Sequence, residues 1–109
     1  LVAYANRAKI DLLGVSPDCL ARFGAVSEET ARAMAEGGRS RGDVDLCVAD
    51  TGIAGPGGGC AERPVGLVHF AVARRDRPTR HARSVFTGDR QAVRQATVTR
   101  ALELLQACL

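Results

Sequence analysis

The clearest chemical signal in the sequence is a glycine-rich run that follows a short apolar segment. Residues 46–49, LCVA, are typical of a buried strand, and residues 51–59, TGIAGPGGG, come one position later. Such a loop leaves several backbone N–H groups unhindered at the carboxyl end of a strand, where α/β proteins bind ligands and such groups hold anions. Thr51 adds a hydroxyl there. The spacing is neither a Walker nor a Rossmann pattern, so a ligand site and a flexible connection are both open interpretations.

Lys9 is the second candidate, because it is the only lysine among 15 basic residues. A lysine acts as a base only when its pKa falls from about 10.4 towards neutrality. Burial and a neighbouring cation both shift the pKa in that direction. Arginine cannot take this role, because its guanidinium does not deprotonate in proteins. A catalytic base and an ordinary surface lysine are therefore the two interpretations of this position.

Arg90 is the third candidate. It follows Gly88 and Asp89 where a strand is expected to pass into a helix, and a helix N-terminus is suited to binding phosphate or carboxylate. The alternative is that Asp89 caps the helix and Arg90 is merely solvated.

Composition excludes several classes of function. The chain has 109 residues, of which 46% are hydrophobic, 25% charged and only 4% aromatic, as expected of a soluble globular domain with an aliphatic core. No run approaches the ~20 apolar residues that a membrane helix needs, and no targeting leader is visible, so we expect a cytoplasmic protein without a membrane partner. The net charge of +3 comes from scattered arginines without stacking aromatics, which argues against a nucleic-acid partner.

Cysteine and histidine positions do not indicate a metal site. The four cysteines and two histidines form no CxxC and no close Cys/His pair along the chain, so we expect no metal and no cofactor. Cys47 and Cys108 fall within apolar patterns and are predicted to be core residues. Cys60, in the glycine-rich run, is predicted to carry an exposed thiol.

Capping residues and helical periodicity predict the elements that position these candidates. Helices are expected near residues 6–13, 16–23 and 27–37, and from about residue 89 to the end of the chain. Asn6, Ser16 and Ser27 are the predicted N-caps, and Gly14 and Gly24 the predicted stops. The third helix is expected to fade at the glycine pair of residues 37–38.

Strands are predicted at residues 46–49, 67–73 and about 80–86, with residues 1–4 as the end of another buried strand. The second and third are close enough for an antiparallel hairpin, and the third has the polar alternation of an edge strand. Residues 46–49, apolar on both faces, favour the centre of a partly parallel sheet. We therefore predict one α/β domain over residues 1–109, a three-layer α/β/α sandwich whose mixed sheet is mostly parallel with one antiparallel strand. Because the sequence opens in an apolar run and lacks an initiator Met, we expect this domain to be incomplete at its N-terminus.

Five runs of the sequence carry a family resemblance. Their order along the chain is YANRAKIDLLGV, FGAVSEETARAMAEGGR, TGIAGPGGG, ERPVG and FTGDR. Together they resemble the C-terminal domain of the competence-damage-inducible CinA family, also known as the stand-alone PncC amidases. The resemblance spans essentially all 109 residues, and the glycine loop and the YxNxxK segment are distinctive as a pair.

The resemblance implies hydrolysis of the amide of nicotinamide mononucleotide to nicotinate mononucleotide and ammonia, without a metal. In that family a Ser–Lys dyad carries the reaction, with the serine in a motif resembling ESCTGG upstream of the YxNxxK segment. Lys9 matches the lysine, and Tyr4, Thr51 and Arg90 match polar residues that line the pocket. The resemblance also implies a homo-oligomer, a dimer or a larger assembly. We expect Lys9, Tyr4 and Thr51 to be catalytic, and the substrate-binding residues to be Arg90, Asn6, Gly52, Ala54, Gly55, Gly57 and Gly58.

The sequence also departs from the family pattern. No ESCTGG run occurs in the 109 residues, which also lack the family's first helix, first strand and following helix. Asp50 stands where the family usually has an apolar residue, and Cys60-Ala61 replaces a commoner Thr-Pro. These departures leave a second interpretation, a nucleotide-binding module without catalytic activity.

Overall fold

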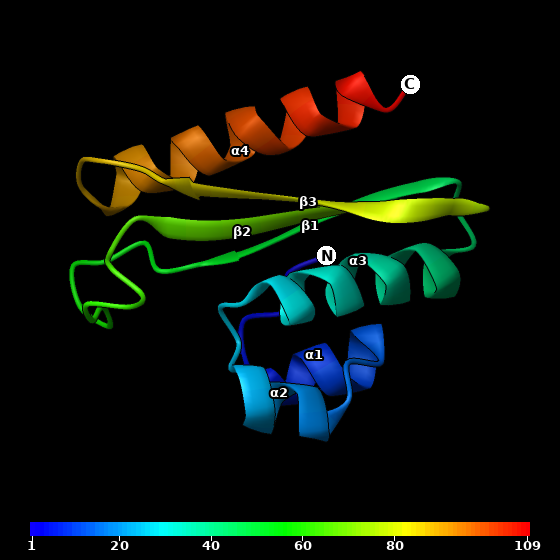
Figure 1. The fold of residues 1–109 in the computed structure, drawn as a ribbon, viewed down its shortest axis with the longest axis horizontal. Coiled ribbons are helices and arrows are strands. Elements are labelled where there is room, and N and C mark those ends of the chain that lie inside the picture. Colours follow the sequence, from blue (N-terminus) through cyan, green and yellow to red (C-terminus); the bar gives the residue numbers. More distant parts are fainter.

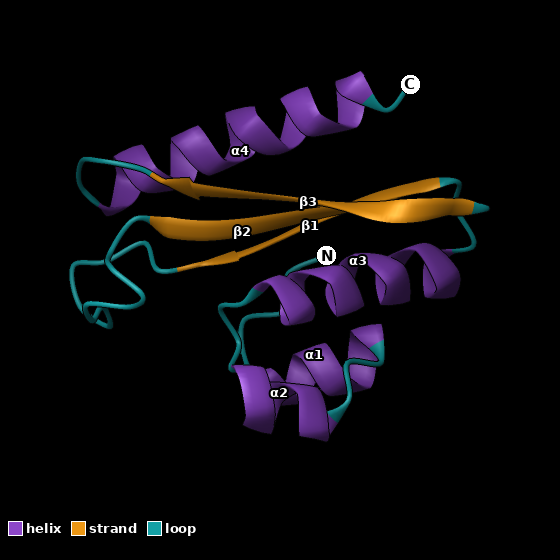
Figure 2. Cartoon of the chain, viewed as in Figure 1, coloured by secondary structure: helices purple, strands orange, loops and turns teal.

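A three-stranded sheet lies between helices on both of its faces (Figure 1). The computed structural model describes residues 1–109 throughout. The strands are β1 (Leu46–Gly52), β2 (Leu67–Arg74) and β3 (Arg77–Val85). On one face lies α3 (Glu28–Gly42), with α1 (Asn6–Leu13) and α2 (Pro17–Phe23) packed beyond it, and on the other lies α4 (Arg90–Ala107) (Figure 2). The predicted three layers of an α/β fold are present.

The predicted mostly parallel sheet is wrong. The strand order is β1-β2-β3, and both neighbouring pairs are antiparallel. Adjacent parallel strands need a long crossover connection, usually a helix, whereas residues 53–66 between β1 and β2 contain no helix. This segment, called the glycine loop below, folds back on itself and returns the chain beside β1. The predicted hairpin of β2 and β3 is confirmed, with Asp76 in its turn at a φ of 57°.

The strand β1 lies at an edge of the sheet, whereas its apolar sequence predicted the centre. Both of its faces are covered because helices flank the sheet on both sides. Ala49 packs on the side of α3 and Val48 on the side of α4. Residues 46–49 are therefore half-buried by the two helical layers, and the central strand, which is more fully buried, is β2.

The hydrophobic core is divided by the sheet into two clusters of different character. Between α3 and the sheet, the buried residues are small, namely Ala31, Ala35, Ala71 and Ala73. Between α4 and the sheet they include larger side chains, namely Val68, Phe70, Val93 and Ala101. A third cluster joins α1 to α3 through Leu13, Val15 and Met34.

Most of the predicted helix boundaries are confirmed by capping hydrogen bonds. The Ser16 hydroxyl accepts from the Cys19 N–H at 3.0 Å, and the Ser27 hydroxyl accepts from the Thr30 N–H at 3.1 Å. Gly14 ends α1 with a left-handed φ of 69°. Asn6 is not the N-cap of α1 but its first helical residue, since Ala5 holds the cap position without a side-chain hydrogen bond.

Two further expectations were wrong. The helix α3 does not fade at residues 37–38 but continues to Gly42, because the glycine surface there packs closely against α1. Residues 1–4 do not form a strand; Leu1 and Val2 are 89% and 85% exposed. None of the four helices combines the length and the apolar composition that spanning a bilayer would require.

Candidate active site

The side chain of Lys9 is buried in the helical layer, with only 5% of the residue exposed. It lies on α1, and its Nζ donates to the carbonyl oxygens of Ala3 at 2.9 Å and Tyr4 at 3.2 Å. No carboxylate lies within ion-pair distance of this amine; the acidic residue on the same helix, Asp11, pairs with Arg7. Burial lowers the pKa of Lys9 below its usual value. The site therefore contains a desolvated amine held by backbone oxygens alone.

Tyr4 and Asn6 flank this amine in sequence but are exposed. Tyr4 is 85% exposed, and only its backbone carbonyl reaches Lys9. The phenol therefore makes no contact with the amine in this arrangement. Asn6 opens α1 and makes no side-chain hydrogen bond.

Thr51 lies at the end of β1 and is 8% exposed. Its hydroxyl donates to the carbonyl oxygen of Ala25 at 2.8 Å. Ala25 belongs to residues 24–27, called the α2–α3 connection below, which runs along the end of the sheet. Because this hydroxyl already donates its proton, its lone pairs are the part that is free to accept from a ligand.

The end of β1 and the glycine loop that follows it depend on close packing at several glycines. A Cβ added at Gly52 would lie 2.7 Å from the Leu67 carbonyl oxygen, so β1 and β2 meet at a spacing that only glycine allows. Gly55 has a φ of +84°, and a Cβ there would lie 2.5 Å from Val65. Gly57, by contrast, has nothing within 4 Å. The loop is thus tightly packed at its base and open at its tip.

Arg90 connects the start of α4 to the glycine loop. Its Nη1 donates to the Gly55 carbonyl oxygen at 3.0 Å. Asp89 caps the helix by accepting from the Ala92 N–H at 2.9 Å, as the alternative interpretation of this segment predicted. Arg90 is nevertheless more than a solvated side chain, because it holds the backbone of the loop.

The structure brings some of the predicted site residues together and separates others. Arg90 and Gly55 are in direct contact, and Thr51 lies at the base of the same loop. Lys9 forms no hydrogen bond with Thr51 or with any residue of the loop; its acceptors are Ala3 and Tyr4. The candidate residues therefore form two separate groups. One is the amine of Lys9 in the helical layer, and the other is the glycine loop with Arg90 at the end of the sheet.

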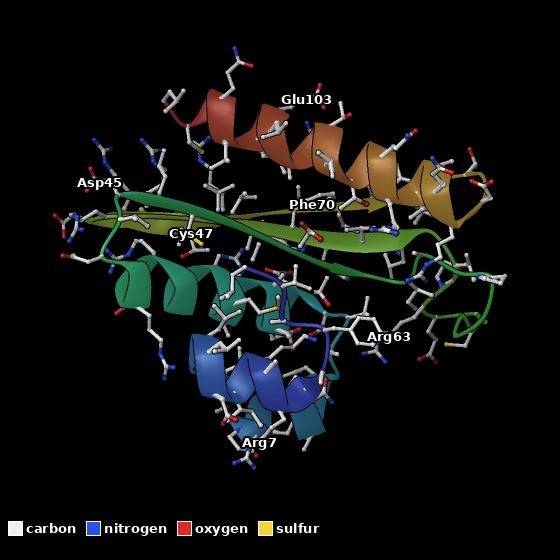
Figure 3. The ribbon with its side chains drawn as sticks, turned by 180° about the vertical axis from the view of Figure 1, so that it is seen from behind. Arg7, Asp45, Cys47, Arg63, Phe70 and Glu103 are labelled. Carbon is white, nitrogen blue, oxygen red and sulfur yellow. The ribbon has the colours of Figure 1, made fainter.

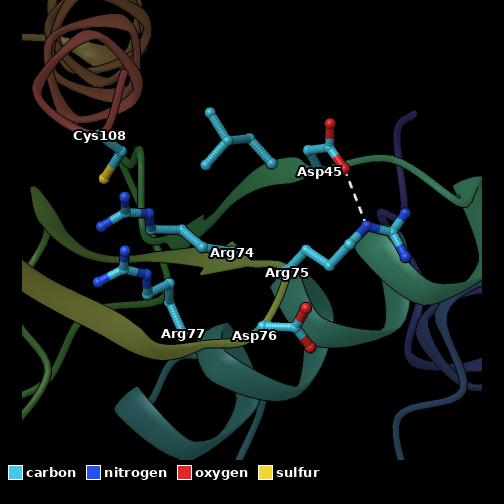
Figure 4. Close-up of a pocket in the computed structure, with 7 residues that line it drawn as sticks. Asp45, Arg74, Arg75, Asp76, Arg77 and Cys108 are labelled. Carbon is cyan, nitrogen blue, oxygen red and sulfur yellow. Dashed lines mark hydrogen bonds and ion pairs between the residues drawn. The ribbon is translucent and has the colours of Figure 1, made fainter.

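Two surface hollows lie mostly away from these residues. One, of about 350 Å³, is at the turn between β2 and β3, where Arg74 and Arg77 point towards Cys108 (Figure 4). That turn is at the opposite end of the sheet from Thr51. Another hollow, of about 830 Å³, runs along the outer side of α4 and is lined by Arg90, Gln91, Arg94, Gln95, Val98 and Thr99. Arg90 is the single predicted site residue that lines either hollow.

Asp50, the residue of β1 that departs from the family pattern, has an environment that is unusual for a carboxylate. The residue is exposed overall, and no arginine or lysine pairs with it. Partial desolvation of the carboxyl group raises the pKa of Asp50 above its usual value. Since neighbouring residues of a strand face opposite sides, Asp50 lies on the α4 side of the sheet and Thr51 on the α3 side.

Sequence reasoning missed two groups near this end of the sheet. The first is Arg63, whose guanidinium donates to the carbonyl oxygens of Phe23 and Val26. The second is a pair of histidines, His69 and His81, whose ring nitrogens lie 2.9 Å apart. Hairpin register, which places both on the α3 face of neighbouring strands, is the signal that would have found the histidine pair.

Comparison with known proteins identifies the family. The family model described as the CinA C-terminal domain matches residues 1–109. The chain belongs to the CinA C-terminal domain family. Among curated CinA-like proteins, that of Geotalea daltonii is 52% identical over 106 residues, which cover 97% of this chain and 25% of the relative. The CinA-like protein of Mycobacterium leprae is 47% identical over 110 residues, covering 100% and 26%. The chain thus spans about a quarter of the length of these CinA-like relatives.

Solved structures of the CinA superfamily share the fold. The competence/damage-inducible protein CihA from Agrobacterium tumefaciens superposes with a TM-score of 0.92 at 50% identity, covering 95% of this chain and 64% of that chain. A CinA superfamily protein from Escherichia coli superposes with a TM-score of 0.92 at 38% identity, covering 99% and 62%.

Proposed function

We propose that this CinA domain forms the lysine half of a nicotinamide mononucleotide deamidase. The observation that carries the proposal is Lys9, the only lysine of the chain, buried at 5% exposure with no carboxylate partner. Burial lowers the pKa of this amine, which is the change that a lysine base requires. Family membership supports the same reaction class, since the YxNxxK segment contains Lys9.

In the proposed reaction a serine outside the 109 residues attacks the carboxamide carbon of the nucleotide. Neutral Lys9 takes the serine proton as the C–O bond forms, and passes a proton to the nitrogen as the C–N bond breaks and ammonia leaves. Water then releases nicotinate mononucleotide from the acyl-serine. The developing oxyanion needs N–H or hydroxyl donors, which the backbone N–H groups of the glycine loop supply in this proposal. Thr51, whose proton is donated to Ala25, accepts a hydrogen bond from the substrate carboxamide. Arg90 compensates the charge of the phosphate.

The second candidate is a nucleotide-binding module without catalysis. It is favoured by the contacts of Lys9, because hydrogen bonds to the carbonyl oxygens of Ala3 and Tyr4 stabilise the charged ammonium. In this function Lys9 ties the start of the chain to α1, and the loop binds its ligand without a reaction.

The test is ammonia release from nicotinamide mononucleotide by the full-length protein and two Lys9 variants. General-base catalysis contributes about 10²- to 10⁴-fold, so Lys9→Ala is expected to lower kcat by about that factor. Lys9→Arg keeps the positive charge but cannot deprotonate, so it is expected to be as inactive as Lys9→Ala. Activity of the wild type should rise with pH as Lys9 loses its proton.

Arg7→Ala is the matched control, since Arg7 lies on the same helix, is exposed and pairs only with Asp11. It is expected to leave kcat unchanged. Wild-type turnover in folded Lys9→Ala contradicts the dyad. Calorimetric binding of the nucleotide without any ammonia release by the wild-type protein favours the binding module instead.

A further inference from the structure

The carbonyl oxygens at the end of α2 and along the α2–α3 connection accept hydrogen bonds from side chains. Arg63 Nη2 donates to the Phe23 carbonyl oxygen at 2.7 Å, and Arg63 Nε donates to that of Val26 at 3.0 Å. Between these two acceptors, the carbonyl of Ala25 accepts from Thr51 at 2.8 Å. Arg63 and Thr51 therefore hold neighbouring peptide groups, and the position of one hydroxyl of the candidate site depends on the segment that Arg63 fixes.

The carbonyl of Gly24, which lies between those of Phe23 and Ala25, is also occupied. It accepts from Thr30 Oγ1 at 2.6 Å and from Ser27 Oγ at 3.0 Å. Four consecutive carbonyl oxygens, at residues 23–26, thus point at side-chain donors. Gly24 has a φ of +79°, and a Cβ there would lie 3.6 Å from the Arg63 guanidinium, so the arginine lies directly over this glycine.

Arg63 belongs to the glycine loop, 37 residues along the chain from Val26. It projects from the loop towards the helical layer (Figure 3). Two residues later, Val65 packs in the other direction, against the backbones of Gly55 and Gly59. Val65 therefore connects the arm of the loop that Arg63 attaches with the part that Arg90 holds through the Gly55 carbonyl.

We propose that Arg63 is a positioning residue, which attaches the returning arm of the glycine loop to the α2–α3 connection and so holds the loop in its ligand-binding conformation. Arg63 itself is exposed, so this role does not come from burial in the core. Its planar fork matches two carbonyl oxygens three residues apart, a geometry that a single ammonium does not reproduce. In combination with the proposed function, this assigns Arg63 to binding of the nucleotide and not to bond cleavage.

The first measurement is hydrogen–deuterium exchange of the full-length protein without ligand. Arg63→Ala is expected to speed exchange of the loop amides, from residue 54 to residue 60, by about 10-fold. The reason is that both hydrogen bonds of the Arg63 guanidinium, to the carbonyls of Phe23 and Val26, are lost. Arg63→Lys keeps the charge and one attachment, and should lie between Arg63→Ala and the wild type. The matched control is Arg75→Ala at the other end of the sheet, which loses three hydrogen bonds to residues distant in sequence, namely those to Asp43, Val44 and Asp45.

The second measurement is steady-state kinetics with nicotinamide mononucleotide. Arg63→Ala is expected to raise KM about 10-fold with kcat within about twofold, and Arg63→Lys to recover part of this loss. Loop exchange that is the same in Arg63→Ala and the wild type overturns the proposal, as does a fall in kcat at unchanged KM. A wild-type protein that releases no ammonia refutes the proposed function alone, since the exchange experiment still decides whether Arg63 orders the loop.

Discussion

His69 and His81 form a hydrogen-bonded pair on neighbouring strands, with ring centroids 5.2 Å apart. His81 also lies 3.6 Å from Glu28 at the start of α3. A nitrogen–nitrogen hydrogen bond of 2.9 Å needs one ring to donate and the other to accept, so the two rings cannot both be protonated at that contact. Burial, followed by the charges of His81 and Arg83, lowers the pKa of His69, while Glu28 and Glu29 act in the opposite direction.

The pair makes stability depend on pH in a defined direction. The folded protein keeps His69 neutral to a lower pH than the unfolded chain, whose histidines titrate near pH 6.5. Below about pH 6.5 the unfolded state therefore binds more protons, and the free energy of unfolding falls as pH falls. Urea unfolding at pH 7.0 and 5.5 should show this loss in the wild type and a smaller loss in His69→Gln. A His69→Gln variant with the full wild-type loss would show that other groups cause it.

The helices α1 and α3 meet at Gly37, inside α3. A Cβ at this position would overlap the carbonyl oxygen of Leu13, at the end of α1. Glycine weakens an isolated helix by about 1 kcal/mol relative to alanine, yet here it allows two helices to approach closely. This contact explains why α3 continues through a glycine pair where local propensity predicted its end.

Gly37→Ala should therefore destabilise the protein despite the better helix propensity of alanine. We expect the free energy of unfolding to fall by about 1–3 kcal/mol, the usual cost of overpacking, as measured by urea denaturation. Gly57→Ala, at a position with nothing within 4 Å, is the matched control and should change stability by less than about 0.5 kcal/mol. Equal effects at the two positions would contradict the packing argument.

How far the sequence predicts this fold depends on whether the cause is local. The caps at Ser16 and Ser27 were predictable because each hydroxyl bonds to an N–H three residues away. The direction of β2 was not, because it depends on how the glycine loop closes and not on the composition of either strand. The same difference separates the site residues. Arg90 was found from its position at a helix start, whereas the acceptors of Arg63 are peptide carbonyls, which no residue type marks in the sequence.

At the scale of the whole molecule, the two helical layers contribute unequally to the core. Residues between α3 and the sheet are alanines, which bury little area each, while Phe70 on the α4 side is fully buried. Its ring meets that of Phe86 edge-on, with centroids 6.3 Å apart, and lies between the sheet and α4 (Figure 3). The attachment of α4, and with it the position of Arg90, depends on this larger side chain.

Phe70→Ala is expected to lower the free energy of unfolding by about 3–5 kcal/mol, the usual cost of removing a buried aromatic ring. The neighbouring Ala71→Gly, which faces α3 from the same strand, should cost only about 1 kcal/mol. Thermal unfolding followed by circular dichroism compares the two, and a similar loss in both variants would refute the unequal division of the core.

The two arginines that attach the glycine loop bind the same kind of acceptor, and this affects how the domain tolerates mutation and acidification. Arg63 and Arg90 both bond to peptide oxygens, at positions 23, 26 and 55. Every amino acid supplies the same oxygen, and none of these oxygens gains or loses a proton in the physiological range. Mutation of the side chain at position 23 or 26 thus leaves the acceptor in place, and acidification that protonates histidines leaves both anchors intact. These two anchors are tied to the main chain itself, so of the side chains that form them only the two arginines must be retained.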